Sequence, residues 1–198
     1  MMTEKDKMLA GKPYLAFDKE LFLERQNAKE LLFEINHLPP SDLEKRKTLF
    51  KKLLGKTNGN FHIEQPFFCD YGNNIEVGKN FYANHNCIIL DCAKVKIGDN
   101  VLLAPNVSLF TVGHPIDAEK RNEGWEYAFP ITIGNNVWVG GNTVINAGIT
   151  IGDNVVIGSG SVVTKDIPAN TLAMGNPCRV YREITEEDKK YYFKKLEF

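Results

Sequence analysis

The stretch of sequence that decides the fold runs from residue 131 to residue 166 and reads ITIGNNVWVGGNTVINAGITIGDNVVIGSGSVVTKD. Every sixth residue in it is isoleucine or valine, at Ile133, Val139, Ile145, Ile151, Ile157 and Val163. Two positions earlier, most residues are small or β-branched, at Ile131, Val137, Thr143, Ile149, Val155 and Ser161. Side chains alternate along a strand, so residues two apart point to the same side. Each six-residue unit therefore predicts a short strand with two inward side chains.

Turns must separate these strands. The aliphatic position is followed by glycine at Gly134, Gly140, Gly152 and Gly158. Glycine, asparagine and aspartate tolerate the dihedral angles that tight turns need. Ile133-Gly134-Asn135-Asn136 returns eighteen residues later as Ile151-Gly152-Asp153-Asn154, which predicts triangular coils of three strands. Such coils stack at the ~4.8 Å spacing of hydrogen-bonded strands. The repeat thus predicts a mainly β fold, a left-handed parallel β-helix of hexapeptide repeats; its regularity is the reason to accept an exception to right-handed crossovers.

Two breaks interrupt the repeat. Between Val77 and Ile97 two extra residues intrude, and we expect them near Asp91-Cys92. After Leu109 the phase resumes only at Ile133, which leaves an inserted loop over residues 111–130. Loops of this length in a compact domain are usually functional.

The β-helix is expected over residues 57–184, with a helical segment before it and a short helix after it. In residues 1–56, Asp18 can cap a helix that runs to Asn36. Ser41 and Glu44 fit a capping box for a second helix, and Gly55 is a candidate left-handed C-cap. Residues 185–198 are expected to form a helix packed on the other end. Because few coils give little independent core, we expect a homotrimer formed through the flat faces.

Composition excludes several classes of protein. The 198-residue chain has a formal net charge of −1, so no overall positive field attracts nucleic acid or an anionic membrane. The N-terminus lacks the apolar run of a signal peptide, and no segment has the ~20 apolar residues of a membrane span. The four cysteines form neither a CxxC pair nor a zinc spacing. We expect a cytoplasmic protein with reduced thiols and no metal.

The chain resembles the maltose and galactoside O-acetyltransferases over nearly its whole length. The matching stretches are Cys69-Asp70-Tyr71-Gly72, Asn80-Phe81-Tyr82-Ala83-Asn84, Ala104-Pro105-Asn106-Val107, Gly113-His114-Pro115, Ile133-Gly134-Asn135-Asn136-Val137-Trp138, Val163-Thr164-Lys165-Asp166-Ile167-Pro168 and Gly175-Asn176-Pro177-Cys178-Arg179. The segments 114–117 and 121–122 resemble maltose-type members, whereas the tail from Arg179 to Phe193 resembles galactoside-type members. The resemblance implies an acetyl-CoA-dependent transfer of an acetyl group to a sugar hydroxyl, with active sites shared between the subunits of a trimer.

Such a transfer needs a base for the hydroxyl and donors for the oxyanion on the thioester carbonyl. The resemblance implies that His114 is the catalytic base and that Asn84 contacts the acceptor or the developing oxyanion. It also implies acceptor contacts at Asp70 and, more loosely, at Asp18. An acceptor-contact aspartate of galactoside-type relatives aligns with Cys92, so the neighbouring Asp91 is a candidate in its place.

The resemblance also predicts where coenzyme A binds. Trp138 is expected to line the acyl and pantetheine channel, the N–H of Gly141 to donate to the oxyanion, and Ser159 to contact the pantetheine arm through its main chain. The phosphate end is expected at Thr164, Lys165, Arg179 and Arg182.

Four alternatives remain open at this point. One is an acetyltransferase that acts on an amino sugar or on serine. A second is an acetyl-cysteine mechanism at Cys87. A γ-type carbonic anhydrase would bind zinc through histidines, but His62, His85 and His114 do not recur at coil intervals. The last is a catalytically silent scaffold, which gives no reason for a histidine on a long loop.

Overall fold

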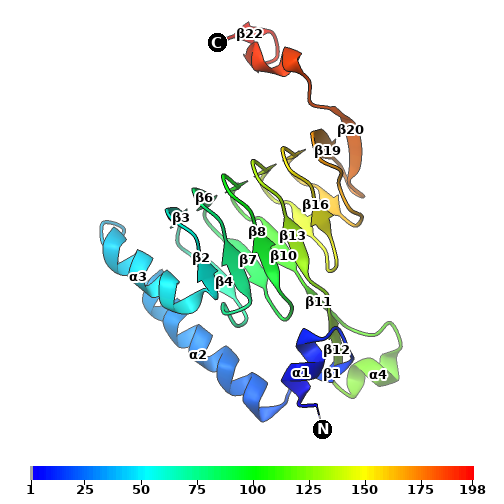
Figure 1. Ribbon diagram of the computed structural model, residues 1–198. Helices are drawn as coiled ribbons and strands as arrows, with labels where there is room; N and C mark the ends of the chain where they lie inside the picture. Colours follow the sequence, from blue (N-terminus) through cyan, green and yellow to red (C-terminus); the bar gives the residue numbers. More distant parts are fainter. Residues whose placement is uncertain (1) are drawn as a thin grey trace.

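The computed structural model describes residues 2–198 and shows five stacked triangular coils, flanked by helices and by a protruding loop (Figure 1). The strands form three parallel sheets, which we call the first, second and third faces. The first face consists of β2 (Lys56–Thr57), β5 (Ile75–Val77), β8 (Val95–Ile97), β13 (Ile131–Ile133) and β16 (Thr150–Ile151). The second face consists of β3 (Phe61–Ile63), β6 (Phe81–Ala83), β9 (Leu102–Leu103), β14 (Trp138–Val139), β17 (Val156–Ile157), β19 (Thr171–Met174) and the antiparallel β20 (Arg179–Glu183). The third face consists of β4 (Phe67–Cys69), β7 (Cys87–Leu90), β10 (Ser108–Phe110), β15 (Val144–Ile145) and β18 (Val162–Val163).

The chain visits the faces in the order first, second, third in every coil. Two edges of the prism are named here after the faces that they join. The second–third edge is the set of turns that leave second-face strands, and the third–first edge is the set of turns that leave third-face strands. Residues on the same edge of successive coils lie above one another.

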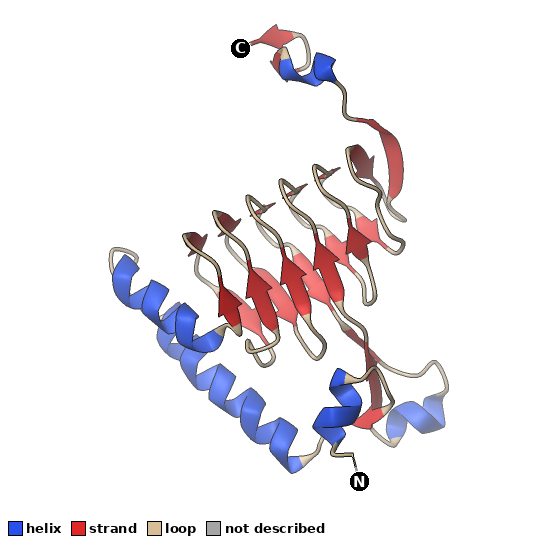
Figure 2. Ribbon diagram, viewed as in Figure 1, coloured by secondary structure: helices blue, strands red, loops and turns tan. Residues whose placement is uncertain are grey.

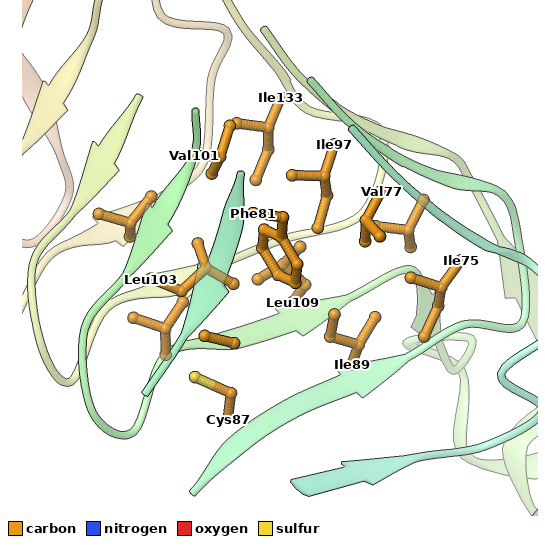
Figure 3. Packing of buried hydrophobic residues seen from close by; sticks show 14 of the residues in the cluster. Ile75, Val77, Phe81, Cys87, Ile89, Ile97, Val101, Leu103, Leu109 and Ile133 are labelled. Carbon is orange, nitrogen blue, oxygen red and sulfur yellow. The ribbon is translucent and has the colours of Figure 1, made fainter. Parts of the chain in front are cut away.

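The core is the column of inward side chains inside the prism. The six aliphatic residues of the repeat, from Ile133 to Val163, are all buried. Figure 3 shows this packing in the two preceding coils, where Phe81, Leu103 and Leu109 point into the same interior. The predicted six-residue pattern of inward residues is confirmed.

Glycine and asparagine have different roles at the turns. Gly134 has no left-handed backbone; instead, a Cβ there would lie 2.3 Å from Asp153 in the next coil, so only glycine allows the coils to stack. The left-handed dihedral angle belongs to asparagines such as Asn100 and Asn136, with φ of 57° and 56°. The Nδ2 group of Asn100 donates to Oδ1 of Asn136 at 3.0 Å, which links the turns of two coils.

Both breaks of the repeat lie where the sequence predicts them. The two extra residues lie at Asp91-Cys92, between β7 and β8. The inserted loop is an ordered excursion that comprises β11 (Val112–Gly113), α4 (Ala118–Asn122) and β12 (Trp125–Ala128). A strand from the N-terminal segment, β1 (Tyr14–Leu15), pairs with β12 and completes a small sheet in the order β1-β12-β11.

α2 (Lys19–Asn36) and α3 (Leu43–Leu53) cover one end of the prism, whereas α1 (Glu4–Leu9) lies beside the small sheet of the inserted loop (Figure 2). Asp18 caps α2, as predicted, because Oδ1 accepts the N–H groups of Glu20 and Leu21. The predicted capping box of Ser41 and Glu44 is wrong: Asp42 is the N-cap of α3 and makes no side-chain cap bond.

Gly55 is not a left-handed C-cap either. The C-cap of α3 is Leu54, in an extended conformation, and Gly55 has no positive φ. A Cβ at Gly55 would lie 2.1 Å from the carbonyl oxygen of Asn73. Close contact with the next coil is therefore what requires glycine at this position.

The predicted C-terminal helix is wrong. Residues 185–198 contain one short 3-10 turn at Glu186–Lys189 and a hairpin of β21 (Tyr191–Phe193) and β22 (Leu196–Glu197). The segment extends away from the coils (Figure 1), and its aromatic residues Tyr192, Phe193 and Phe198 stay exposed. With Tyr191, Tyr192 and Phe193 consecutive, the side chains alternate across a strand instead of forming one helical stripe.

Candidate active site

Residues of the third–first edge surround a cavity of about 340 Å³ next to His114. The cavity is lined by Ala16, Phe17, Arg25, Asp70, Leu90, Cys92, Val112, His114 and Glu126. They come from three sources: the N-terminal segment, the third–first turns of the two lowest coils and the inserted loop. The volume and the mixture of apolar and convergent polar groups are typical of a small-molecule site.

His114 follows β11 directly and is half exposed. Its Nε2 atom lies 3.8 Å from Oε1 of Glu126, on the neighbouring strand β12. The other carboxylate oxygen of Glu126 accepts a 2.6 Å hydrogen bond from the hydroxyl of Tyr14. Burial raises the pKa of Tyr14, so the hydroxyl keeps its proton and donates. A carboxylate fixed beside an imidazole is the arrangement that orients and stabilises a catalytic base.

Asp70 is the second carboxylate that lines the cavity. The thiol of Cys92 donates to Oδ2 of Asp70 at a distance of 3.4 Å. Burial raises the pKa of Asp70, while this hydrogen bond and the charge of Arg25 act in the opposite direction. Arg25 itself donates to the hydroxyl of Tyr71 and to the carbonyl of Ala16, each at 2.7 Å. The cavity therefore holds two carboxylates whose environment is fixed by buried donors.

The prediction that Asp91 contacts the acceptor is wrong. Its side chain is fully buried, and its oxygens accept the backbone N–H groups of Asp70, Tyr71 and Asn74 at 3.1, 2.8 and 3.3 Å. Burial raises the pKa of Asp91 to about 6. Asp91 organises the turn that carries Asp70 and does not face the cavity.

Asp18 also has a structural role, as the cap of α2. The residues of this turn that line the cavity are Ala16 and Phe17, not Asp18.

A second cavity, of about 460 Å³, adjoins the first along the same edge. It is lined by Phe110, Val112, Tyr127, Phe129, Asn146, Ala147 and Thr164, and Val112 lines both cavities. Thr164 lies at the third–first edge after β18, and the exposed Lys165 follows it. The two cavities thus share Val112, and Lys165 directly follows a residue that lines the second one.

The remaining predicted residues lie on the second face and the second–third edge. Trp138 projects from β14 with 52% of its surface exposed. Asn84, Gly141 and Ser159 follow β6, β14 and β17, so they lie on the same edge of different coils. Among residues 2–198, no acceptor takes the N–H of Gly141.

The two C-terminal arginines differ in their surroundings. Arg179 begins β20 and is exposed, and its guanidinium donates to the carbonyl of Cys178. Arg182 makes two hydrogen bonds to Asp188, at 2.6 and 2.8 Å, which lower the pKa of that carboxyl to about 2. Arg179 is the less neutralised of the two cations.

The structure divides the predicted site residues between the two edges of the third face. His114, Asp70, Thr164 and Lys165 lie on the third–first edge, whereas Asn84 lies on the second–third edge. The strands of the third face separate the two edges. In the second coil, for example, strand β7 lies between Asn84 and Asp91. Within a single chain, His114 and Asn84 therefore lie at opposite edges of the third face, and Asn84 does not line the cavity at His114.

Sequence reasoning did not find Glu126, Tyr14, Arg25 or Phe17. One signal was available: Trp125-Glu126-Tyr127-Ala128 has the β-rich composition of a strand that could pair back onto the loop. The partner strand lies more than one hundred residues away, at Tyr14, and no local pattern points to it.

Within residues 2–198, no group of three or more histidine, cysteine, aspartate or glutamate side chains is arranged to hold a metal ion. His62 contacts Glu64, and His85 contacts the carbonyl of Gln65, so these histidines have separate surroundings. The four cysteines are free and buried. None of the described helices combines the length and apolar character that crossing a bilayer requires.

Comparison with known proteins identifies the family. Residues 7–59 match the maltose acetyltransferase hexapeptide capping motif, and residues 130–165 match the bacterial transferase hexapeptide model of six repeats. The galactoside O-acetyltransferase of Escherichia coli K12 is 52% identical over 98% of this chain and 94% of its own length. A maltose O-acetyltransferase from Clostridium difficile 630 superposes with a TM-score of 0.92 at 56% identity, covering 93% of this chain and 99% of that one.

A galactoside acetyltransferase in complex with coenzyme A superposes with a TM-score of 0.97 at 50% identity, covering 100% of this chain and 99% of that one. This likeness confirms the predicted fold, a left-handed parallel β-helix of hexapeptide repeats. The chain belongs to the family of maltose and galactoside O-acetyltransferases, which are hexapeptide-repeat acyltransferase enzymes.

Proposed function

We propose that this protein transfers the acetyl group of acetyl-CoA to a hydroxyl of a sugar, with His114 as the general base. The observation that carries the proposal is the cavity at His114. It combines a histidine, two carboxylates and an apolar side, and it adjoins a second cavity whose lining includes Thr164, the residue before Lys165. Carboxylates accept hydrogen bonds from the hydroxyls of a neutral acceptor, and the histidine can remove the proton of one of them.

His114 takes the hydroxyl proton as the sugar oxygen attacks the thioester carbonyl carbon. The carbon–sulfur bond then breaks, and the proton passes from His114 to the departing sulfur. The carboxylate of Glu126, 3.8 Å away, favours the imidazolium that forms in between. Tyr14 holds Glu126 in place through its 2.6 Å hydrogen bond.

Donors for the oxyanion are proposed at the second–third edge of a neighbouring subunit. The N–H of Gly141 and the side chain of Asn84 are the candidates, since both lie on that edge. A homotrimer in which the second–third edge of one subunit meets the third–first edge of the next brings these donors to His114. Closed cyclic assembly repeats the same contact three times and forms three equivalent sites.

Coenzyme A supplies the acetyl thioester, and the described residues fit it. The exposed indole of Trp138 offers a flat apolar surface, and the main chain at Ser159 is accessible on the same side. Thr164, Lys165 and Arg179 provide a hydroxyl and two exposed cations for the phosphates, while Arg182 is partly neutralised by Asp188.

Transfer through an acetyl-cysteine at Cys87 is disfavoured. Cys87 is fully buried, and burial raises its pKa to about 11, so little thiolate exists near neutral pH. The four cysteines are free, as is usual for proteins of the reducing cytoplasm, and we propose that this protein acts in that compartment.

Turnover of acetyl-CoA against a panel of maltose, glucose, galactosides, glucosamine and serine tests the function. We expect release of coenzyme A with maltose, glucose or galactosides, and an O-acetyl sugar identified by mass and NMR spectra. An N-acetyl product from glucosamine, or a preference for serine, would show that the acceptor is an amine or serine and not a sugar hydroxyl. No turnover with any member would reject the proposal.

A further inference from the structure

Phe17 is an aromatic residue exposed beside the proposed acceptor cavity. It lies in the turn between β1 and α2, with 85% of its surface exposed. Its neighbour Ala16 is buried, and Asp18 is fixed as the helix cap, so the turn itself is held firmly. Phe17 nevertheless lines the same cavity as His114. Single exposed apolar residues are common on protein surfaces, but this one lines a cavity and is therefore placed to contact a bound molecule.

The inserted loop leaves room for the ring. Gly124, with φ of 88°, lies against Phe17: a Cβ there would be 3.3 Å from Cδ2 of the ring. The N–H of Ala16 points to the carbonyl of Gly124 at 3.5 Å. The ring therefore rests against the loop that carries His114 and Glu126, and its position is coupled to the site.

The lining of the cavity is divided by chemistry. Its polar part consists of the carboxylates of Asp70 and Glu126 and the imidazole of His114. Its apolar part consists of the side chains of Phe17, Leu90 and Val112. A pyranose is divided in the same way, because its hydroxyls form a polar rim and its ring C–H groups form apolar faces. The positive C–H groups suit the negative face of an aromatic ring.

We propose that Phe17 is a specificity-determining residue of the acceptor site, against which one C–H face of a pyranose packs while Asp70 and Glu126 hold hydroxyls. The inference rests on the proposed function and adds the acceptor class: pyranosides with one unobstructed C–H face. An acceptor without a ring, such as serine, gains nothing from Phe17.

Phe17→Ala tests the inference, with Phe22→Ala as the matched control. Phe22 is a half-exposed phenylalanine on α2 that does not line the cavity. We expect Phe17→Ala to raise the KM for a pyranoside about tenfold, as the loss of part of an aromatic burial implies. The kcat and the KM for acetyl-CoA should stay within about twofold of the wild type. Phe22→Ala should behave as the wild type, and Phe17→Trp should keep a low acceptor KM.

Two results would overturn the inference. One is an unchanged acceptor KM in Phe17→Ala. The other is loss of the assembled oligomer in light scattering, which would make Phe17 a contact between subunits. Saturation-transfer NMR with methyl glucopyranoside and methyl galactopyranoside separates this inference from the function itself. Transfer to ring C–H protons that disappears in Phe17→Ala supports stacking even without turnover, and transfer equal in both proteins refutes it.

Discussion

The hydroxyl of Tyr14 donates a 2.6 Å hydrogen bond to Oε2 of Glu126, and the same two residues are direct partners in the pairing of β1 with β12. The N-terminal segment is thereby joined twice to the loop that carries His114. A Cβ at Gly113, just before His114, would lie 2.5 Å from the hydroxyl of Tyr127, so the other strand of the loop is tightly packed as well. The histidine follows a fixed hairpin and not a free loop.

Tyr14→Phe removes only the donor to Glu126. We expect kcat to fall about three- to tenfold, since a hydrogen bond to a charged group is lost and the carboxylate becomes free to move away from His114. The KM for acetyl-CoA should not change. Steady-state kinetics check this, with Tyr192→Phe on the exposed C-terminal hairpin as control. Equal kcat values in Tyr14→Phe and wild type would contradict the role of this bond.

His114→Ala should lower kcat by the ~10²–10⁴-fold typical of a lost general base. Acetyl-CoA binding should persist, because other residues make those contacts. Calorimetric titration with coenzyme A and steady-state kinetics measure the two effects separately. The control is His37→Ala, which changes an exposed histidine at the end of α2. Near-normal turnover in His114→Ala would exclude this mechanism.

Mixing two inactive variants tests whether the sites are shared. His114→Ala and Asn84→Ala each damage every site of their own homotrimer. After random exchange of subunits at equal amounts, about a quarter of the sites should combine an intact Asn84 with an intact His114 from the next subunit. Turnover should rise accordingly. If native mass spectrometry shows mixed trimers without any gain in turnover, the two residues do not meet across subunits.

Lys165→Ala and Arg179→Ala should each raise the KM for acetyl-CoA about tenfold and leave the KM for sugar unchanged, as the loss of one charge-assisted phosphate contact implies. Arg182→Ala should have a smaller effect, because Arg182 already pairs with Asp188. Comparison with dephospho-coenzyme A locates the contact: a cation that binds the 3′-phosphate loses its effect with that analogue. Equal changes for both substrates would argue against phosphate binding.

Asp91 makes stability depend on pH. Burial raises its pKa to about 6 in the folded protein, against the usual 3.8 of an aspartate. The folded state thus holds the proton more tightly, so this contribution is complete below pH 3.8 and is lost as the pH rises through 6. The difference amounts to about 3 kcal/mol. Asp91→Asn cannot titrate, although it replaces one of two acceptor oxygens: Oδ1, which accepts from Asp70 and Tyr71, or Oδ2, which accepts from Asn74.

Urea unfolding at one fixed protein concentration, between pH 3.5 and 7, measures this difference. The stability advantage of wild type over Asp91→Asn should shrink as the pH rises from about 4 to about 6. An advantage that grows over this interval would show that burial does not dominate the titration of Asp91.

Local sequence determined the coils, because each strand repeats its burial pattern within six residues. Ile133 and Val163 could be recognised as inward from their own neighbours, and the missing phase after Leu109 marked the inserted loop. Asp18 could be recognised as a helix cap for the same reason, since a cap acts on N–H groups two and three residues away.

Only the tertiary structure decided how the site is built. Tyr14 and Glu126 are 112 residues apart and meet because the loop folds back onto the N-terminal strand. Asp91 and Asp70 follow equivalent strands, yet stacking of the coils buries Asp91 against the turn of Asp70 and leaves Asp70 at the cavity. Periodicity encodes which residues of a strand point inward. It does not encode which turn covers another, because that depends on contacts between coils that are distant along the chain.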